Sequence, residues 1–160
     1  MQHTGYKGSK DEVRALSAYV KLMRATESLS ARVHRHLAKA SLTISQFGAL
    51  EALYHLGPLS QAEIAKKVLK STGNMTMVID NLEKRGLVSR KRSEVDRRFY
   101  EVNLTAAGKE LIKSLFPRHA AGIMDEMKVL NSVELVSLAN LCRRLGLQIT
   151  KEGKGGKKHV

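Results

Sequence analysis

The sequence is poor in cysteine and has no long apolar run. Cys142 is the single cysteine among 160 residues, which excludes an internal disulfide and every zinc site built from several cysteines. No apolar stretch approaches the ~20 residues needed to cross a bilayer, and the opening MQHTGYKGSKDEVRA lacks the hydrophobic block of a signal peptide. We therefore expect a cytoplasmic protein that does not enter the membrane, and the length indicates one domain.

Acidic residues are also scarce. Lys and Arg number 28 against 15 Asp and Glu, giving a formal net charge of +13. Such an excess favours a polyanionic partner, although lysines can also simply keep a protein dispersed. Charge alone leaves both interpretations open.

Motifs for catalysis and metal binding are missing as well. The six histidines show no H-E-x-x-H or comparable spacing, and His34 and His36 point to different faces of a helix. The chain has neither a nucleophile elbow nor a glycine-rich phosphate loop. We therefore predict no catalytic residue, metal site or cofactor, and a protein that is not an enzyme. Cys142 lies in an apolar helical stretch, where we expect a buried, inert thiol.

What is present is helical periodicity along most of the chain. Apolar residues recur at three- and four-residue steps over 11–40, which predicts one long amphipathic helix. Thr105 is expected to cap a fifth helix that Pro117 should interrupt or kink. A leucine-rich sixth helix is predicted within 130–149.

Between these long helices lie shorter ones. Thr43 precedes a helix that should end at Gly57-Pro58. SQAEIAKKVL begins with an S-x-x-E capping box at Ser60. Ser71 or Thr72 opens the next helix, STGNMTMVIDNLEKRG. The last two have the dimensions of a helix-turn-helix, a pairing that is a weak signal by itself.

Two strand-like runs strengthen this signal. LVSRKR and FYEVNL flank SEVDRR, and the alternation in FYEVNL should direct Tyr100, Val102 and Leu104 toward the core. Between Lys84 and Arg98, seven basic residues face only two acidic ones, so this corner is not an ordinary solvated surface. The order helix, turn, helix, hairpin is that of a winged helix. The predicted fold class is mainly α (α+β), a winged helix-turn-helix DNA-binding lobe joined to a helical dimerisation region.

The run LTISQFGALEALYHLGPLSQAEIAKKVLKSTGNMTMVIDNLEKRGLVSR, followed by DRRFYEVNLTAAGKELI, resembles the MarR (multiple-antibiotic-resistance repressor) family of winged-helix transcription regulators. The resemblance covers about 12–148. It implies a DNA-binding lobe at 43–105, dimerisation helices at 11–40 and 106–149, a flexible N-terminus at 1–10 and a basic disordered tail at 151–160.

The resemblance also implies partners. These are double-stranded operator DNA, a second copy of the chain in an obligate homodimer, and a small-molecule or oxidant cue. ALYHLGPLSQAEIAKKVLKSTGN together with FPRHA resembles the branch of the family that responds to quinones and other aromatic electrophiles.

Site residues follow from motif and resemblance together. The DNA-binding candidates share the two short helices and the hairpin: Ser60, Gln61, Ser71, Thr72, Asn74, Thr76, Met77, Asn81, Lys84, Arg90, Arg92, Asp96, Arg97 and Arg98. Asp96 is expected to orient Arg98 by a charge-assisted hydrogen bond. The dimerisation candidates share the first and last helices: Val13, Leu16, Val20, Val136, Leu138, Leu141 and Leu145. Met77 stands where the family frequently has arginine, so strong guanine reading is not expected there.

The predicted function is a ligand- or stress-responsive repressor that binds a palindromic operator through a recognition helix and a wing. The alternative is an architectural protein that coats DNA through charge with little sequence preference. The polar face of the recognition helix argues against coating, which needs only phosphate contacts.

Overall fold

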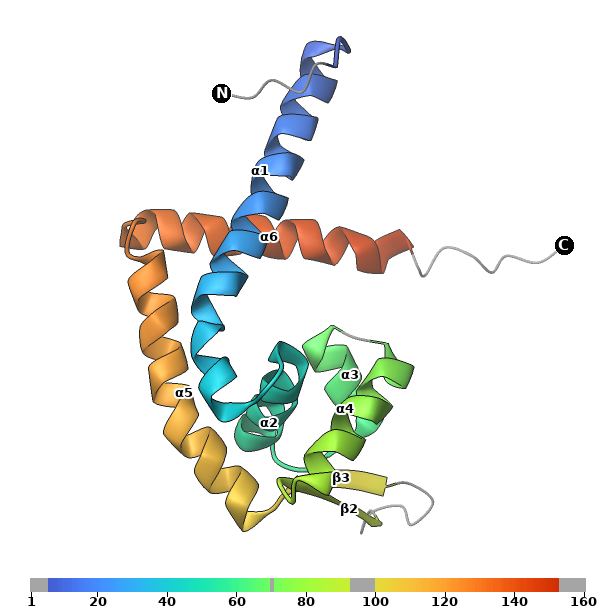
Figure 1. Ribbon diagram of the computed structural model, residues 1–160. Helices are drawn as coiled ribbons and strands as arrows, with labels where there is room; N and C mark the ends of the chain where they lie inside the picture. The colour runs from blue at the N-terminus through green and yellow to red at the C-terminus, as the bar shows by residue number, and fades with distance from the viewer. Residues whose placement is uncertain (1–5, 70, 93–99, 153–160) are drawn as a thin grey trace, which may run out of the picture. The chain divides into compact units, whose positions relative to one another are not determined.

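The computed structural model describes residues 6–69, 71–92 and 100–152, and the side chains as far as Leu147. The elements in chain order are α1 (Lys10–Val33), η1 (Arg35–Ala40), α2 (Ile44–Leu56), β1 (Leu59–Ser60), α3 (Gln61–Val68), α4 (Thr72–Lys84), β2 (Val88–Arg92), β3 (Tyr100–Leu104), α5 (Ala106–Met127) and α6 (Ser132–Glu152) (Figure 1). The predicted order of helices and hairpin is confirmed. Residues 1–5 of the predicted flexible N-terminus and residues 153–160 of the predicted basic tail lie outside the described residues. No described helix could cross a membrane.

Side-chain caps begin the helices of the predicted DNA-binding lobe. Thr43 and Gln46 form a capping box at the start of α2, and Ser60 and Glu63 form one at the start of α3. Ser71 begins α4 by accepting a hydrogen bond from a backbone N–H of the first turn. Each cap satisfies amide groups that a helix start leaves without partners. The three starts are therefore fixed locally, as the sequence indicated.

The first helix differs from its prediction. Instead of running through 11–40, α1 ends at Val33, and the 3-10 helix η1 continues to Ala40. Ser41 then adopts a left-handed conformation with φ of 50°. The Arg85 guanidinium, from the end of α4, donates to the carbonyl oxygens of Ala40 at 3.1 Å and Ser41 at 2.7 Å. This tertiary contact gives hydrogen-bond donors to the carbonyl groups at the end of η1. The spacing of apolar residues in the sequence does not predict it.

The core gathers side chains from η1, α2, α3, α4, α5 and the sheet. Its largest fully buried members are Phe47, Leu37, Leu50, Ile64, Met75, Ile79, Leu82, Ile112, Val88 and Val102. Helices α2, α3 and α4 pack together above the hairpin of β2 and β3 (Figure 1). Because α4 contributes three of these residues from one face, its opposite face is left exposed.

The sheet has the order β1-β3-β2, with both pairings antiparallel. The two-residue strand β1 was not predicted, because it is too short to show alternation. Val102 is buried as expected, but the prediction that Tyr100 faces the core is wrong. Tyr100 is 53% exposed because it lies beyond the core at the end of the hairpin nearest the connecting segment, opposite Arg92. The Arg92 guanidinium lies 5.8 Å from the centre of its ring.

Helix α5 runs through Pro117 without a break, so an interruption there is wrong, whereas the alternative of a kink stays a prediction. Its first turn is fixed by a very close packing contact. A Cβ atom added to Gly108 would lie 1.9 Å from the carbonyl oxygen of Leu87, so only glycine fits there. The Thr105 side chain accepts from the Gly108 amide at 3.0 Å, confirming the predicted cap.

The structure divides into two compact units, Met1–Gly122 and Ile123–Val160; the predicted boundaries within the chain remain a proposal.

Candidate nucleic-acid interface

Only three residues separate α3 from α4 along the chain. Leu69 ends α3 in a left-handed conformation with φ of 54°, and Ser71 caps α4. The inner face of α4 is buried through Met75, Ile79 and Leu82. The outer face is thus held out to solvent by a rigid scaffold, the arrangement of a helix that enters a groove.

Four of the predicted DNA-binding residues make hydrogen bonds within the chain. The Ser60 hydroxyl donates to the Glu63 carboxylate at 2.7 Å, as part of the capping box. The Ser71 hydroxyl accepts from a backbone N–H. The Gln61 amide donates to the Thr76 hydroxyl at 2.5 Å, and that hydroxyl donates in turn to the main chain of α4. The hydrogen bond between Gln61 and Thr76 links α3 to α4, whereas Ser60 and Ser71 each cap the start of their own helix.

Arg90 is a fifth residue with contacts inside the lobe. Its guanidinium, on β2, lies 2.6 Å from the Asp80 carboxylate and 2.5 Å from that of Glu83, both on α4. The Arg90 backbone N–H also donates to Glu83 at 2.9 Å, and Gln61 accepts from the guanidinium at 3.4 Å. Partial burial by itself would lower the pKa of Arg90. The hydrogen bonds to Asp80 and Glu83 have a larger combined effect, so the pKa of Arg90 is raised.

This contact, which we call the Arg90 clamp (Arg90, Asp80, Glu83), was missed by the sequence reasoning. Arg90 was counted among the free basic residues of the wing. A signal was present, since two acids three residues apart lie on one helix face. The clamp ties the recognition helix to the hairpin.

The remaining described candidates present exposed side chains. They are Thr72, Asn74, Met77, Asn81, Lys84 and Arg92. Within the described part of the chain, the side-chain amides of Asn74 and Asn81 make no hydrogen bond. Both border, with Met77, a hollow of about 290 Å³ between α4 and the start of α2. These side chains are available to a ligand that approaches the outer face of α4.

The predicted wing tip falls in the segment between Arg92 and Tyr100. Asp96, Arg97 and Arg98 therefore lie outside the described residues, as does the predicted contact of Asp96 with Arg98. The ends of β2 and β3 on either side are described, and both belong to the same sheet as β1. The base of the hairpin is thus fixed.

The dimerisation candidates are incompletely buried in the single chain. On α1, Leu16 is 38% exposed and Val13 and Val20 are half-buried. On α6, Val136, Leu141 and Leu145 are all more than half exposed, and Leu138 is half-buried. Other large apolar side chains of these helices are exposed as well: Tyr19, Met23, Val133 and Leu147. Each helix therefore carries apolar surface that the chain itself leaves in water.

Cys142, also on α6, is exposed, so the expected burial of its thiol is wrong for the single chain. The reason is that the apolar face of α6 is not covered within its own unit. No described group of three His, Cys, Asp or Glu side chains is placed to hold a metal ion.

A cluster of histidines in the first unit was not anticipated. The His119 ring of α5 lies 5.2 Å from that of His34, 5.3 Å from that of His36 and 4.5 Å from that of Phe47, measured between centroids. Burial, followed by the charges of His34 and His36, lowers the pKa of His119 to about 4. Among the described residues, Nδ1 of His119 and Nε2 of His36 are buried and have no hydrogen-bond partner. His119 is therefore neutral near pH 7.

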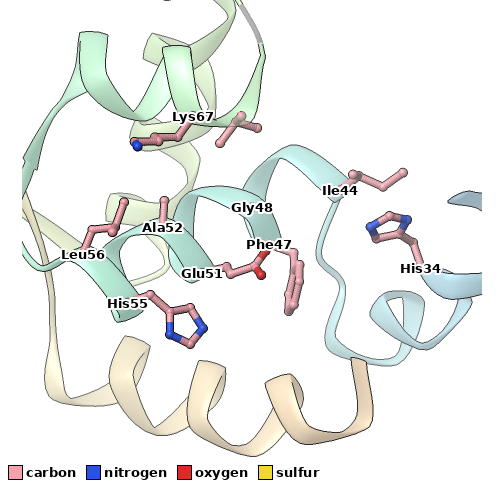
Figure 2. A pocket seen from close by; sticks show the side chains of 10 residues that line it. His34, Ile44, Phe47, Gly48, Glu51, Ala52, His55, Leu56 and Lys67 are labelled. Atoms are coloured by element: carbon pink, nitrogen blue, oxygen red, sulfur yellow. The ribbon is translucent and has the colours of Figure 1, made fainter. Parts of the chain in front are cut away.

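His34 also borders a pocket of about 410 Å³ along α2. Figure 2 shows Phe47, Glu51 and His55 on one side of this helix, and Lys67 of α3 beyond its other side, near Ala52 and Leu56. Apolar walls with a few polar groups are typical of small-molecule sites. The pocket has room for a ligand the size of one or two rings.

Comparison with known proteins places these features in a family. The profile of the MarR family matches residues 42–99. The HTH-type transcriptional regulator MhqR of Bacillus subtilis (strain 168) is 34% identical over 134 residues, covering 84% of this chain and 92% of that protein. The uncharacterized regulator YkoM of the same strain is 31% identical over 140 residues, covering 87% of this chain and 91% of that one.

Solved structures agree. Bordetella bronchiseptica BpsR, whose structure concerns the regulation of its DNA binding by 6-hydroxynicotinic acid, superposes with a TM-score of 0.73 at 26% identity, over 81% of this chain and 98% of that chain. AbsC, a MarR family regulator of Streptomyces coelicolor, has a TM-score of 0.80 at 19% identity, over 91% of this chain and 99% of that one. The second likeness concerns the fold alone.

Proposed function

Because the chain belongs to the MarR family of winged-helix transcriptional regulators, we propose that it is a cytoplasmic repressor that binds a palindromic operator as a homodimer and releases it when a small effector binds. Its family is a class of DNA-binding regulators and not of enzymes. The observation that carries the proposal is the outer face of α4: exposed polar side chains on a helix whose other face is fixed in the core.

The DNA-binding role divides the candidate residues into two groups. Thr72, Asn74, Met77, Asn81, Lys84 and Arg92 would contact DNA, together with Arg97 and Arg98 of the wing. Gln61, Thr76 and Arg90 would hold the two helices and the hairpin in register, and Ser60 and Ser71 would cap α3 and α4, because the polar atoms of all five already have partners within the lobe. Asp96 keeps its proposed task of orienting Arg98.

A competition binding assay tests sequence-specific repression against the architectural alternative. The DNA upstream of the chain's own gene and a random duplex of equal length would compete for the protein at physiological salt. A regulator should prefer its operator by roughly 1000-fold or more, because specific complexes exceed non-specific ones by at least that factor. Equal affinity for both duplexes would favour a protein that coats DNA.

Dimerisation is supported by the exposed apolar side chains of α1 and α6. Light scattering at micromolar concentration should give twice the mass of the chain. Leu141→Asp should cause dissociation or misfolding, because it places a charge where we expect an apolar interface. Asn140→Asp, one residue away and also exposed, adds the same charge and should remain dimeric. A monomeric wild type would remove this part of the proposal.

The effector is proposed to be aromatic and to occupy the pocket along α2. Support comes from the volume and lining of the pocket and from BpsR, whose DNA binding is regulated by an aromatic acid. Hydroquinones and benzoquinones are the first probes. Ala52→Trp should fill the pocket and abolish release from DNA, whereas Ala107→Trp on the exposed side of α5 should not. Release that survives Ala52→Trp would place the effector elsewhere.

A variant of Cys142 distinguishes an effector that reacts covalently with the protein from one that binds without reacting. Its exposure leaves a thiol reaction open, but the thiol is not among the residues that line the pocket. We expect Cys142→Ser to retain both DNA binding and release. Loss of release with intact DNA affinity would instead make thiol chemistry the signal.

A further inference from the structure

We infer that each operator half-site presents consecutive A·T base pairs to the middle of α4, and that Met77 contacts thymine methyl groups there. The inference deepens the proposed function, since it assumes that α4 enters the major groove. It concerns what the helix can read, which depends on the side chains that are free on its outer face.

The free side chains follow from the contacts of α4. Thr76 is not among them, because its hydroxyl donates to the carbonyl of Thr72 and accepts from Gln61. Asp80 is held in the Arg90 clamp. In the central turns this leaves Asn74, Met77 and Asn81, which border one hollow and so share one side of the helix.

Spacing shows how much DNA these three side chains can cover. They stand at positions i, i+3 and i+7 of a helix that rises 1.5 Å per residue, so the outer two are separated by about 10 Å along the axis. At about 3.4 Å per base pair, this corresponds to roughly three base-pair steps. One helix face can therefore reach a short run of adjacent base pairs.

The chemistry of the three groups selects for A·T pairs. An asparagine amide pairs with N6 and N7 of adenine through two hydrogen bonds, and an apolar side chain contacts the C5-methyl group of thymine. A guanine is read most often by Arg or Lys, and α4 contains neither until Lys84 in its last turn. The amides of Asn74 and Asn81 make no hydrogen bond within the described chain, so they are free to pair with bases.

Met77 is the distinctive member of the set. It is 65% exposed and is the large apolar side chain that stands between the amides of Asn74 and Asn81 at the same hollow. Its flexible thioether adapts to an uneven surface. Burial against methyl groups in the groove would remove this apolar surface from water, an effect equivalent to about fourfold in affinity for one methyl group.

The first test is selection of binding sites from random duplexes with the full-length dimer. We expect the enriched sequence to carry A·T pairs at adjacent positions in both half-sites. Met77→Arg should change one of these positions toward G·C, and it should unfold at the temperature of the wild type because the residue is exposed. G·C pairs throughout the wild-type half-site would overturn the inference while leaving the proposed function intact. A selection that enriches no sequence would overturn both.

The second test isolates the methyl group. Each thymine of the selected half-site is replaced in turn by deoxyuridine, which lacks only that methyl. At one or two positions the wild type should lose about fourfold in affinity, whereas Met77→Ala should be insensitive to the same replacements. Equal losses for both proteins, or no loss for either, would show that Met77 does not read methyl groups.

Discussion

Removing the Arg90 guanidinium should destabilise the lobe without removing a DNA contact. In the structure this group donates to two carboxylates of α4, at 2.6 Å and 2.5 Å. Hydrogen bonds to charged groups are each worth about 1.5–3 kcal/mol when buried. The Arg90 side chain is 26% exposed, and those of Asp80 and Glu83 are 44% and 39% exposed, so solvent screening reduces the total.

We therefore expect Arg90→Ala to cost roughly 2 kcal/mol, or about 6 °C in the midpoint of thermal unfolding. Asp80 and Glu83 would be left as neighbouring like charges on one helix face. Arg90→Lys should recover about half of the loss, since an ammonium group lacks the planar fork. Unfolding is followed by circular dichroism at one fixed concentration, because the midpoint of a dimer depends on it.

The same variant separates two roles for the arginine. If Arg90 only holds the clamp, the slope of log affinity against log salt should be unchanged in Arg90→Ala. The exposed Arg92 is the matched control: within the described part of the chain, Arg92→Ala loses only its contact with the Tyr100 ring, so it should cost at most about 1 kcal/mol of stability but lower the slope by about one unit per chain. A shallower slope with full stability in Arg90→Ala would refute the clamp and return Arg90 to the DNA surface.

Other predictions concern packing, protonation and backbone strain. Gly108→Ala should cost about 3 kcal/mol or prevent folding, because its Cβ would collide with the Leu87 carbonyl group; Gly73→Ala, which meets nothing within 4 Å, should fold normally by the same denaturation assay. His119 has a folded-state pKa of about 4 against 6.5, so stability should be constant above pH 6.5 and fall by up to ~3 kcal/mol toward pH 4. His119→Phe should flatten this decline, and an equally steep decline would contradict the assignment. Leu69→Asn should stabilise the lobe by about 1 kcal/mol, because Leu69 is 89% exposed at φ of 54°; a loss of stability would show that the leucine side chain packs against something.

The sequence predicted those features of the fold that local chemistry determines. Thr43, Ser60 and Ser71 cap helices where the motifs indicated, because a hydroxyl that bonds an amide three residues on needs nothing from the rest of the chain. The burial of Met75, Ile79 and Leu82 followed from helical spacing for the same reason.

Features that depend on distant residues were not predictable in this way. The 3-10 helix η1 depends on Arg85, more than forty positions further along the chain. The histidine cluster requires His119 of α5 to lie beside His34. Motifs for metal ligands compare residues that are close in sequence, so they do not predict this contact.

The candidate site shows the same division. The motif predicted which residues lie on the outer face of α4. It could not predict which of their side chains already have hydrogen-bond partners within the lobe. Thr76 and Arg90 have the chemistry of DNA contacts, yet both are bound by partners from other elements. Asn74 and Asn81 have the same kind of chemistry, and their side chains make no hydrogen bond with the described part of the chain. The distinction depends on tertiary hydrogen bonds, which only the structure supplies.

Hydroxyl-radical footprinting on the selected operator tests the central claim most directly, namely that two copies of this lobe each place α4 in a major groove. The account predicts two equivalent protected regions related by a twofold axis, with centres about one helical turn or a whole multiple of it apart, and two chains bound per duplex. Uniform protection along the DNA, or a single protected region occupied by one chain, would contradict it.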